Sequence, residues 1–381
     1  MSKEVVTIQY LRGGAAIMVV LHHMLSPTTE IDYIAIPGLG RFGVEIFFVI
    51  SGFIMWHTTA TSDISSIEFW RRRVVRIVPL YWFFLSLLVL TALLFPQLFH
   101  STAITPENVT KSFLFIPHFH VVQTGLIAPI LIPGWSLDYE MFFYLVFGLV
   151  MFLPSRGLRA TILGLCLSGL VLLGFALQPT GALLSTYTNP DLLKFLDGIV
   201  LAVIYRAGWL NFPKLGSALI AAGILLSLFA APTSSFARLD DLLGFSATSI
   251  VAGALAMEAG AKRRPNLVFL AIGSASYSIY LSHLFFLRAT ELVGQRLSLF
   301  GVSKAFDATY IVIALTLSIV GGICIHYFVE RPILSLRHRR RSVILTDLTP
   351  FGSPHGDTSQ ARPVMLTSVA DGQVIPKNKP N

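Results

Sequence analysis

The chain has 381 residues, of which 54% are hydrophobic, 12% aromatic and only 13% charged. Soluble globular proteins carry about 25% charged residues, so this composition argues against an ordinary soluble domain and indicates a membrane protein. The formal net charge is +8. Because long apolar runs recur along the chain, we attribute this excess to basic cytoplasmic loops and expect no binding to nucleic acid.

Ten apolar stretches are predicted to be the transmembrane helices of an all-α, polytopic protein. The first carries Arg12 and has no small-residue cleavage site, so we expect a retained span rather than a signal peptide. The segment 113–132 is also apolar but contains two prolines and two histidines, which leaves open an eleventh span or a re-entrant loop. The ten expected ranges are 6–25, 43–60, 78–95, 135–153, 158–177, 191–206, 215–231, 243–260, 266–288 and 308–329.

The distribution of basic residues predicts how these spans are oriented. With ten spans and a cytoplasmic N-terminus, 17 Lys and Arg residues fall on one set of loops and 7 on the other. The richer set is assigned to the cytoplasm, which places both termini inside and residues 96–134 in an outer loop. An eleventh span would move Arg156, Arg159 and the basic cluster at 262–264 outside, which this rule disfavours. The cytoplasmic set is Lys3, Arg71, Arg72, Arg73, Arg76, Arg156, Arg159, Arg206, Lys214, Lys262, Arg263, Arg264, Arg331, Arg337, Arg339, Arg340 and Arg341.

The composition changes after Arg341. Residues 342–381 are rich in Ser, Thr, Pro, Gly and Asp and show no sustained apolar period. Such segments cannot bury enough apolar surface to fold. The sequence therefore predicts a transmembrane domain at 1–341 and a disordered cytoplasmic tail at 342–381.

The first span, LRGGAAIMVVLHHM, carries polar residues at both ends. Arg12 and His23 are eleven positions apart, so an α-helix places them on one face, about 16 Å apart along its axis, while His22 points elsewhere. An arginine at the centre of a span costs about 3 kcal/mol and usually faces the bundle interior or a wet cavity. Two interpretations stay open here: a polar path through the bundle, or Arg12 and the histidines reaching the two membrane interfaces.

Further charged residues mark the other spans. Glu45 lies near the outer end of GVEIFFVISGFIM, and Glu140 follows Asp138 in WSLDYEMFFYL, where Asp138 is suited to capping the helix. Arg73 and Arg76 share a face at the inner end of the third span. Two interpretations stay open: the pair binds phosphate groups, or it only marks the cytoplasmic side of the membrane. His283 is interpreted as a hydrogen-bonded buried imidazole. Glu330 and Arg331 are expected to stay at the inner interface.

Taken in order, these stretches resemble membrane-bound acyltransferase family 3, especially its exopolysaccharide O-acetyltransferases. IQYLRGGAAIMVVLHH is similar to the family's opening helix, and RRRVVRIVPLYW resembles its Arg-x-x-Arg element. GVEIFFVISGFIM, WSLDYEMFFYL, YSIYLSHLFF and YFVERPIL match four more elements, although the Asp138-Tyr139 pair departs from the pattern. The resemblance covers residues 5–337 and leaves out the tail.

The resemblance implies a bacterial inner-membrane enzyme that transfers an acyl group, expected to be acetyl, from acetyl-CoA to a hydroxyl of an exported or cell-surface carbohydrate. Its partners would be this carbohydrate and membrane lipids, and no metal is expected. A hydroxyl is a weak nucleophile that needs a base, and His23 is the expected one. A transporter or flippase of a lipid-linked glycan is the alternative, because intramembrane charges also mark transport paths.

The other residues receive roles in the same reaction. Glu45 or Glu140 would orient the His23 imidazole or hold the acceptor. Arg73 and Arg76 would bind the CoA phosphates. Arg12 would stabilise either the thioester oxyanion or the pyrophosphate.

Overall fold

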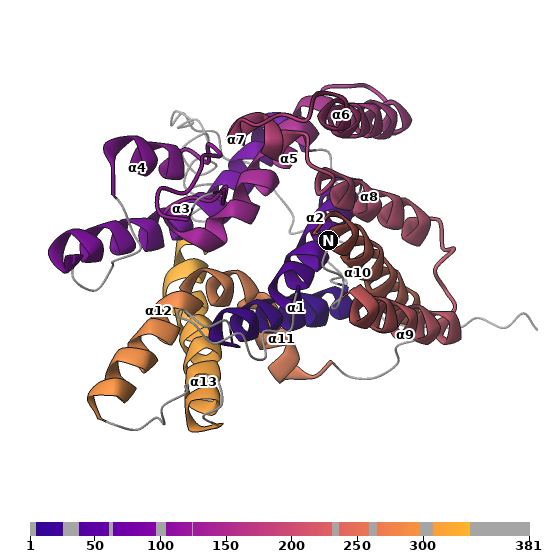
Figure 1. Cartoon of the computed structure of the whole chain (residues 1–381). Helices are drawn as coiled ribbons and strands as arrows, with labels where there is room; N and C mark the ends of the chain where they lie inside the picture. Colours follow the sequence, from indigo (N-terminus) through magenta and orange to yellow (C-terminus); the bar gives the residue numbers. More distant parts are fainter. Residues whose placement is uncertain are drawn as a thin grey trace, which may run out of the picture. The chain divides into compact units, whose positions relative to one another are not determined.

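The computed structural model describes residues 5–25, 38–60, 64–96, 104–123, 125–230, 236–258, 265–297 and 308–335. Within these residues the regular structure is helical, apart from one antiparallel bridge between Phe119 and Ile127 (Figure 1). The expected tail at 342–381 lies outside the described residues. The helices are α1 (Val6–Leu25), α2 (Leu39–Thr59), α3 (Ser66–Leu94), α4 (Pro106–Phe113), η2 (Ile132–Gly134), α5 (Trp135–Val150), α6 (Arg156–Leu177), α7 (Ala182–Tyr187), α8 (Leu192–Arg206), α9 (Pro213–Ala230), α10 (Phe236–Glu258), α11 (Leu267–Ser274), α12 (Ser276–Arg296), α13 (Ala308–Ile325) and the π-helix η4 (His326–Glu330).

Each of the ten expected ranges overlaps a helix of the structure, but the third begins earlier than expected and the ninth is broken into two helices. α3 begins at Ser66 rather than at residue 78, because Ser65 caps it by accepting the Glu68 N–H, so the arginine cluster is helical. The ninth range is broken at Ala275, where α11 and α12 meet at a bend of 73°. The open segment 113–132 is not an eleventh helix, since its described residues from Leu114 to Leu131 form none.

Four helices are long and apolar enough to cross a membrane alone, and the bent α11–α12 pair would make a fifth. The four cover Leu39–Thr59, Ser66–Leu94, Arg156–Leu177 and Ala308–Ser335. The predicted count of ten is therefore not confirmed by helix length and composition. Two of the other helices, α5 and α8, have only 16 and 15 residues. α1 is long enough but carries Arg12 and the two histidines, which lower its hydropathy.

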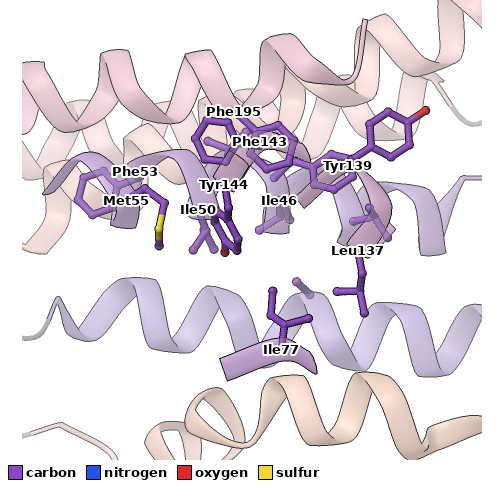
Figure 2. Packing of buried hydrophobic residues seen from close by; sticks show 14 of the residues in the cluster. Ile46, Ile50, Phe53, Met55, Ile77, Leu137, Tyr139, Phe143, Tyr144 and Phe195 are labelled. Atoms are coloured by element: carbon purple, nitrogen blue, oxygen red, sulfur yellow. The ribbon is translucent and has the colours of Figure 1, made fainter. Parts of the chain in front are cut away.

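The core is built around α2. In its most apolar window 72% of the residues are buried inside the protein, against 17% for α6, which therefore presents most of its surface outward. An aromatic stack joins α2, α5 and α8: Phe195 lies 4.4 Å from Phe143 and 4.8 Å from Phe48 between ring centroids. Figure 2 shows Phe143 and Phe195 together beside the α2 side chains Ile46 and Ile50.

Two glycines allow α2 and α8 to cross at backbone distance. A Cβ at Gly52 would lie 2.0 Å from the Phe195 carbonyl oxygen, and a Cβ at Gly198 would lie 2.0 Å from that of Val49. Real Cβ atoms do not approach backbone atoms so closely, so no other residue fits either position. This crossing fixes the positions of the charged residues on the two helices.

The start of α1 is held by α10. Both carboxylate oxygens of Glu258 accept backbone N–H groups, at 3.0 Å from Val6 and 2.9 Å from Thr7. A carboxylate at a helix N-terminus satisfies free N–H groups and favours the helix dipole. The contact fixes the end of α1 from which Arg12 projects.

Candidate active site

Five charged residues from four elements form the group that we call the arginine cluster: Arg12, Arg73, Arg76, Glu140 and Glu330. Arg76 on α3 forms an ion pair with Glu330 of η4. Glu330 is buried and also accepts a hydrogen bond from Ser278 Oγ at 2.6 Å. The sequence did not predict that Glu330, expected at the inner interface, would be buried inside the protein and paired with a cation.

The π-helix η4 supplies a further contact to this carboxylate. His326 Nδ1 lies 2.7 Å from Glu330 Oε2. π-Helical turns inside α-helices frequently occur at functional sites. Here the turn places His326 and Glu330 side by side at the end of α13, facing Arg76.

Glu140 and Arg73 form the other half of the arginine cluster. Glu140 Oε1 accepts hydrogen bonds from Ser51 Oγ at 3.0 Å and from the Tyr144 hydroxyl. The Arg73 guanidinium carbon lies 5.9 Å from the Tyr144 ring centroid and 5.8 Å from that of Phe69. Among the described residues, the buried Nε of Arg73 has no hydrogen-bond partner. Glu140 is thus held by neutral hydroxyls, and Arg73 keeps a donor available.

Arg12 completes the arginine cluster from α1. Its side chain is half-buried and donates to Gln9 Oε1 at 3.3 Å. Its charge interacts electrostatically with those of Arg76, Glu330 and Glu140. The structure therefore brings together four residues that the sequence singled out: Arg12, Arg73, Arg76 and Glu140.

Glu45 belongs to a different group, the α2–α8 ion cluster, which consists of Arg41, Glu45, Asp191 and Lys194. Arg41 Nη2 lies 2.6 Å from Asp191 Oδ1, and Arg41 Nε lies 3.0 Å from Glu45 Oε1. Lys194 Nζ lies 3.0 Å from Asp191 and 3.5 Å from Glu45. Two cations thus meet two carboxylates, and the Arg41 guanidinium also lies over the ring of Trp135 at 5.1 Å.

His23 faces a second imidazole that the sequence reasoning did not connect to it. His23 Nδ1 lies 3.0 Å from the Val19 carbonyl oxygen and 3.4 Å from His283 Nε2 on α12. His283 is fully buried, and its Nδ1 lies 2.7 Å from the Tyr280 carbonyl oxygen. Within the part of the chain that the structure describes, no group of three His, Cys, Asp or Glu residues is arranged to hold a metal ion.

The two adjacent histidines point to different helices, as helical geometry predicts. His22 packs on α2, where a Cβ at Gly40 would lie 2.5 Å from its ring. His23 packs on α12 against His283, with ring centroids 5.0 Å apart. Only His23 therefore lies on the side of α1 where α12 contributes an imidazole.

Asp138 does not cap α5 as its position suggested. The N-cap residue is Gly134, which makes no side-chain hydrogen bond, and Asp138 is buried one turn into the helix. Its Oδ1 has no hydrogen-bond partner among the residues described.

Several of these partners carried only weak signals in the sequence. Asp191 and Lys194 are charged residues inside an apolar stretch, which marks the eighth helix as containing buried polar groups. Glu330 follows His326 by four positions, a spacing that brings side chains together on a helix. Which distant residue each would meet depends on how the helices pack.

Comparison with known proteins identifies the family. The family model described as an acyltransferase domain, that of acyltransferase family 3, matches residues 5–327. The chain belongs to this family. It is 35% identical to the exopolysaccharide production protein ExoZ of Rhizobium meliloti over 311 residues, which cover 80% of this chain and 92% of that protein.

Two further relatives support an acyltransferase enzyme. The acyltransferase MdmB of Streptomyces mycarofaciens is 29% identical over 340 residues, covering 80% of this chain and 84% of MdmB. The O-acetyltransferase OatA of Staphylococcus aureus is 24% identical over 306 residues, covering 72% of this chain but only 49% of OatA. No solved structure matches the chain.

Proposed function

We propose that this membrane acyltransferase transfers an acetyl group from acetyl-CoA to a hydroxyl of a carbohydrate that is exported or displayed at the bacterial cell surface. The observation that carries the proposal is the interaction of the Arg12 charge with those of Arg76, Glu330 and Glu140, while His23 lies further along the same helix beside His283. The relatives named for exopolysaccharide production and O-acetylation support the carbohydrate acceptor and the acetyl group.

The arginine cluster is the proposed donor end. Arginine binds phosphate oxygens through two parallel N–H groups, and such charge-assisted bonds are the strong ones. Arg73 has a buried donor for which the described residues offer no partner, and Arg76 is positioned by Glu330. Because Arg12 lies with them and about 16 Å from His23 along α1, we assign Arg12 to the CoA diphosphate rather than to the oxyanion.

His23 is the proposed general base, and the Val19 carbonyl and His283 together fix which of its nitrogens can accept a proton. A carbonyl oxygen only accepts, so His283 Nδ1 donates its hydrogen to Tyr280, which leaves His283 Nε2 as an acceptor. His23 Nδ1 then donates its hydrogen toward the Val19 oxygen and His283 Nε2. The lone pair of His23 is therefore on Nε2, which is available to the acceptor hydroxyl.

The transfer step needs no proton donor or acceptor besides His23. The acceptor oxygen attacks the thioester carbonyl while its proton passes to His23 Nε2. The carbon–sulfur bond then breaks, and the imidazolium returns that proton to the departing CoA sulfur. Within the arginine cluster, Glu140 is assigned to positioning the donor, whereas we assign Glu45 to holding α2 against α8.

We also propose ten spans in the inner membrane, with both termini in the cytoplasm. In this arrangement the inner side carries the start of α1 and the ends of α2 and α5. A reporter that is active only outside the cytoplasm should be on when fused at Asn108 and off when fused after Arg341. The opposite pattern would contradict the orientation.

The flippase alternative is not favoured, because two of the three relatives described above are named acyltransferases. An assay with purified protein separates the two functions directly. Release of CoA that requires both acetyl-CoA and a glycan acceptor supports transfer. Glycan movement across a vesicle membrane without CoA release would support transport.

The decisive experiment compares the two adjacent histidines. His23→Ala removes the proposed base and should lower the transfer rate by roughly 10²–10⁴. His22→Ala is the matched control, because it removes an imidazole at the same depth that packs on α2 instead. Transfer is measured at equal membrane expression, by mass spectrometry of cell-surface glycans. Equal losses in the two variants, or an active His23→Ala protein, would falsify the assignment.

A further inference from the structure

The π-helical turn η4, which continues α13, buries two polar side chains. In this turn the Arg331 N–H donates to the His326 carbonyl oxygen five residues back. Tyr327 and Phe328 are exposed, whereas His326 and Glu330 have only 7% and 2% of their surface accessible. The imidazole and the carboxylate therefore face the interior of the protein.

A close contact between two helices sets the position of this turn. A Cβ at Gly322, four residues before His326, would lie 2.4 Å from Cγ1 of Ile279 and 2.7 Å from its Cα. α13 is therefore packed directly on the backbone of α12 at the residue after Ser278. This packing brings the Ser278 hydroxyl within hydrogen-bond distance of Glu330.

The two oxygens of the Glu330 carboxylate have different partners. Oε2 lies 2.6 Å from Ser278 Oγ and 2.7 Å from His326 Nδ1, while Oε1 forms the ion pair with Arg76. A carboxylate oxygen only accepts, so His326 Nδ1 carries a hydrogen and donates it. Two donors thus hold Oε2, and Oε1 is left for the guanidinium.

Packing alone does not require these polar groups. Burying an imidazole and a carboxylate costs free energy, and apolar residues of similar volume can often replace a buried ion pair without loss of stability. Their effect on Arg76 gives them a purpose. The Arg76 side chain keeps 27% of its surface accessible, so it can still meet a ligand. A long side chain that is already held in place loses less conformational freedom when it binds.

We propose that His326 is a positioning residue for the acyl-CoA donor. Its Nδ1–H and the Ser278 hydroxyl fix the Glu330 carboxylate. That carboxylate in turn fixes the Arg76 guanidinium in the orientation that receives the CoA diphosphate. The inference rests on the proposed function, in which the arginine cluster is the donor end. His326 acts through Glu330 and does not contact the donor itself.

The test compares two substitutions of His326 that separate hydrogen bonding from packing. An Asn side chain carries an N–H donor at the same number of bonds from Cβ as His Nδ1, whereas Leu fills the space without a donor. CoA binding to the purified full-length protein in phosphatidylcholine nanodiscs is measured by calorimetry. His326→Leu should weaken CoA binding by about threefold to tenfold, within the range of coupling between contacting residues of one network. His326→Asn should bind CoA nearly as tightly as the unmodified protein, whereas a packing role predicts the reverse order.

Further variants test whether the effect passes through the arginine. Ser278→Ala removes the other donor to the same oxygen and should weaken CoA binding to a similar degree. In an Arg76→Gln background, His326→Leu should cause no further loss of CoA affinity, because no guanidinium is left to be oriented. His57→Leu is the matched control. Its imidazole lies on α2, stacked on Phe53 at 5.3 Å and outside the arginine cluster, so CoA affinity should not change.

The outcomes separate failure of this inference from failure of the proposed function. The inference is wrong if His326→Leu binds CoA as tightly as the unmodified protein, if His326→Asn loses as much affinity, or if the loss persists in the Arg76→Gln background. If the unmodified protein does not bind CoA, the acyl-CoA donor is wrong and the inference fails with it. Thermal unfolding shows which variants are folded, and Ser278→Ala provides the same comparison if His326→Leu is not.

Discussion

The arginine cluster and the α2–α8 ion cluster both contain buried charges, but they balance those charges differently. In the α2–α8 ion cluster two cations meet two carboxylates at 2.6–3.5 Å. In the arginine cluster three arginines accompany two glutamates, one of which, Glu140, accepts hydrogen bonds from Ser51 and Tyr144.

This difference in charge balance indicates which of the two clusters is suited to binding an anionic ligand. A buried ion pair whose members satisfy each other holds helices together and has little capacity for another charge. A cluster with surplus positive charge is stabilised when an anion arrives. We therefore assign a structural role to the first group and donor binding to the second.

The largest expected effect on stability comes from removing a carboxylate of the α2–α8 ion cluster. Asp191→Ala would leave Arg41 and Lys194 without their shared carboxylate, and removing one partner of a buried pair typically costs 3–5 kcal/mol. Thermal unfolding of the purified protein should show a clear loss of stability. Glu107→Ala, which breaks the exposed Lys111 pair on α4, is the control and should change little. A stable Asp191→Ala protein would contradict the structural role.

A second test compares what Arg73 and Arg76 contribute to CoA binding and to the stability of the protein. Arg73→Gln should weaken CoA binding by about tenfold, since a charge-assisted contact contributes about 1.5–3 kcal/mol, with little loss of stability. Arg76→Gln should weaken CoA binding and also destabilise the protein, because it leaves Glu330 buried without its cation. Calorimetry and thermal unfolding give the two readouts.

A double variant makes this distinction sharper. Arg76→Gln/Glu330→Gln removes both charges and should recover much of the stability that Arg76→Gln loses, but not the CoA affinity. Contacting residues typically show coupling energies of 0.5–3 kcal/mol. Additive stability losses would mean that Glu330 does not position Arg76.

The smallest expected effect concerns Ser51. Ser51→Ala removes one hydrogen bond to Glu140 and one contact with Tyr144. A typical hydrogen bond contributes about 0.5–1.5 kcal/mol, so CoA affinity should fall less than tenfold. Tyr144→Phe removes the other hydroxyl and should act similarly. An effect as large as that of Arg73→Gln would show that Glu140 contacts the ligand directly.

Apolar runs were enough to predict where ten helical stretches lie, and helical geometry predicted that the adjacent His22 and His23 point to different helices. The sequence predicts that His22 lies off the face that carries His23, and the structure places His22 on α2 and His23 on α12. Such predictions depend on one helix at a time, with its period of 3.6 residues.

Contacts between helices could not be predicted in this way. The sequence suggested that Glu45 or Glu140 orients the His23 imidazole or holds the acceptor. The structure instead pairs Glu45 with Arg41 and Lys194 and places His283 beside His23. The break at Ala275 and the early start of α3 likewise depend on packing and capping. One sequence gives no direct information on which distant helices meet.

The glycine crossing described above limits how the protein can move. Gly52 and Gly198 bring the backbones of α2 and α8 into contact along the middle of α8, and the α2–α8 ion cluster joins the same two helices at their N-terminal ends. The backbone contact and the ion cluster together oppose sliding and rotation of α2 against α8, so we expect the two helices to move as one rigid unit. Any opening that admits or releases a substrate must therefore come from other helices moving relative to this unit rather than from α2 and α8 separating.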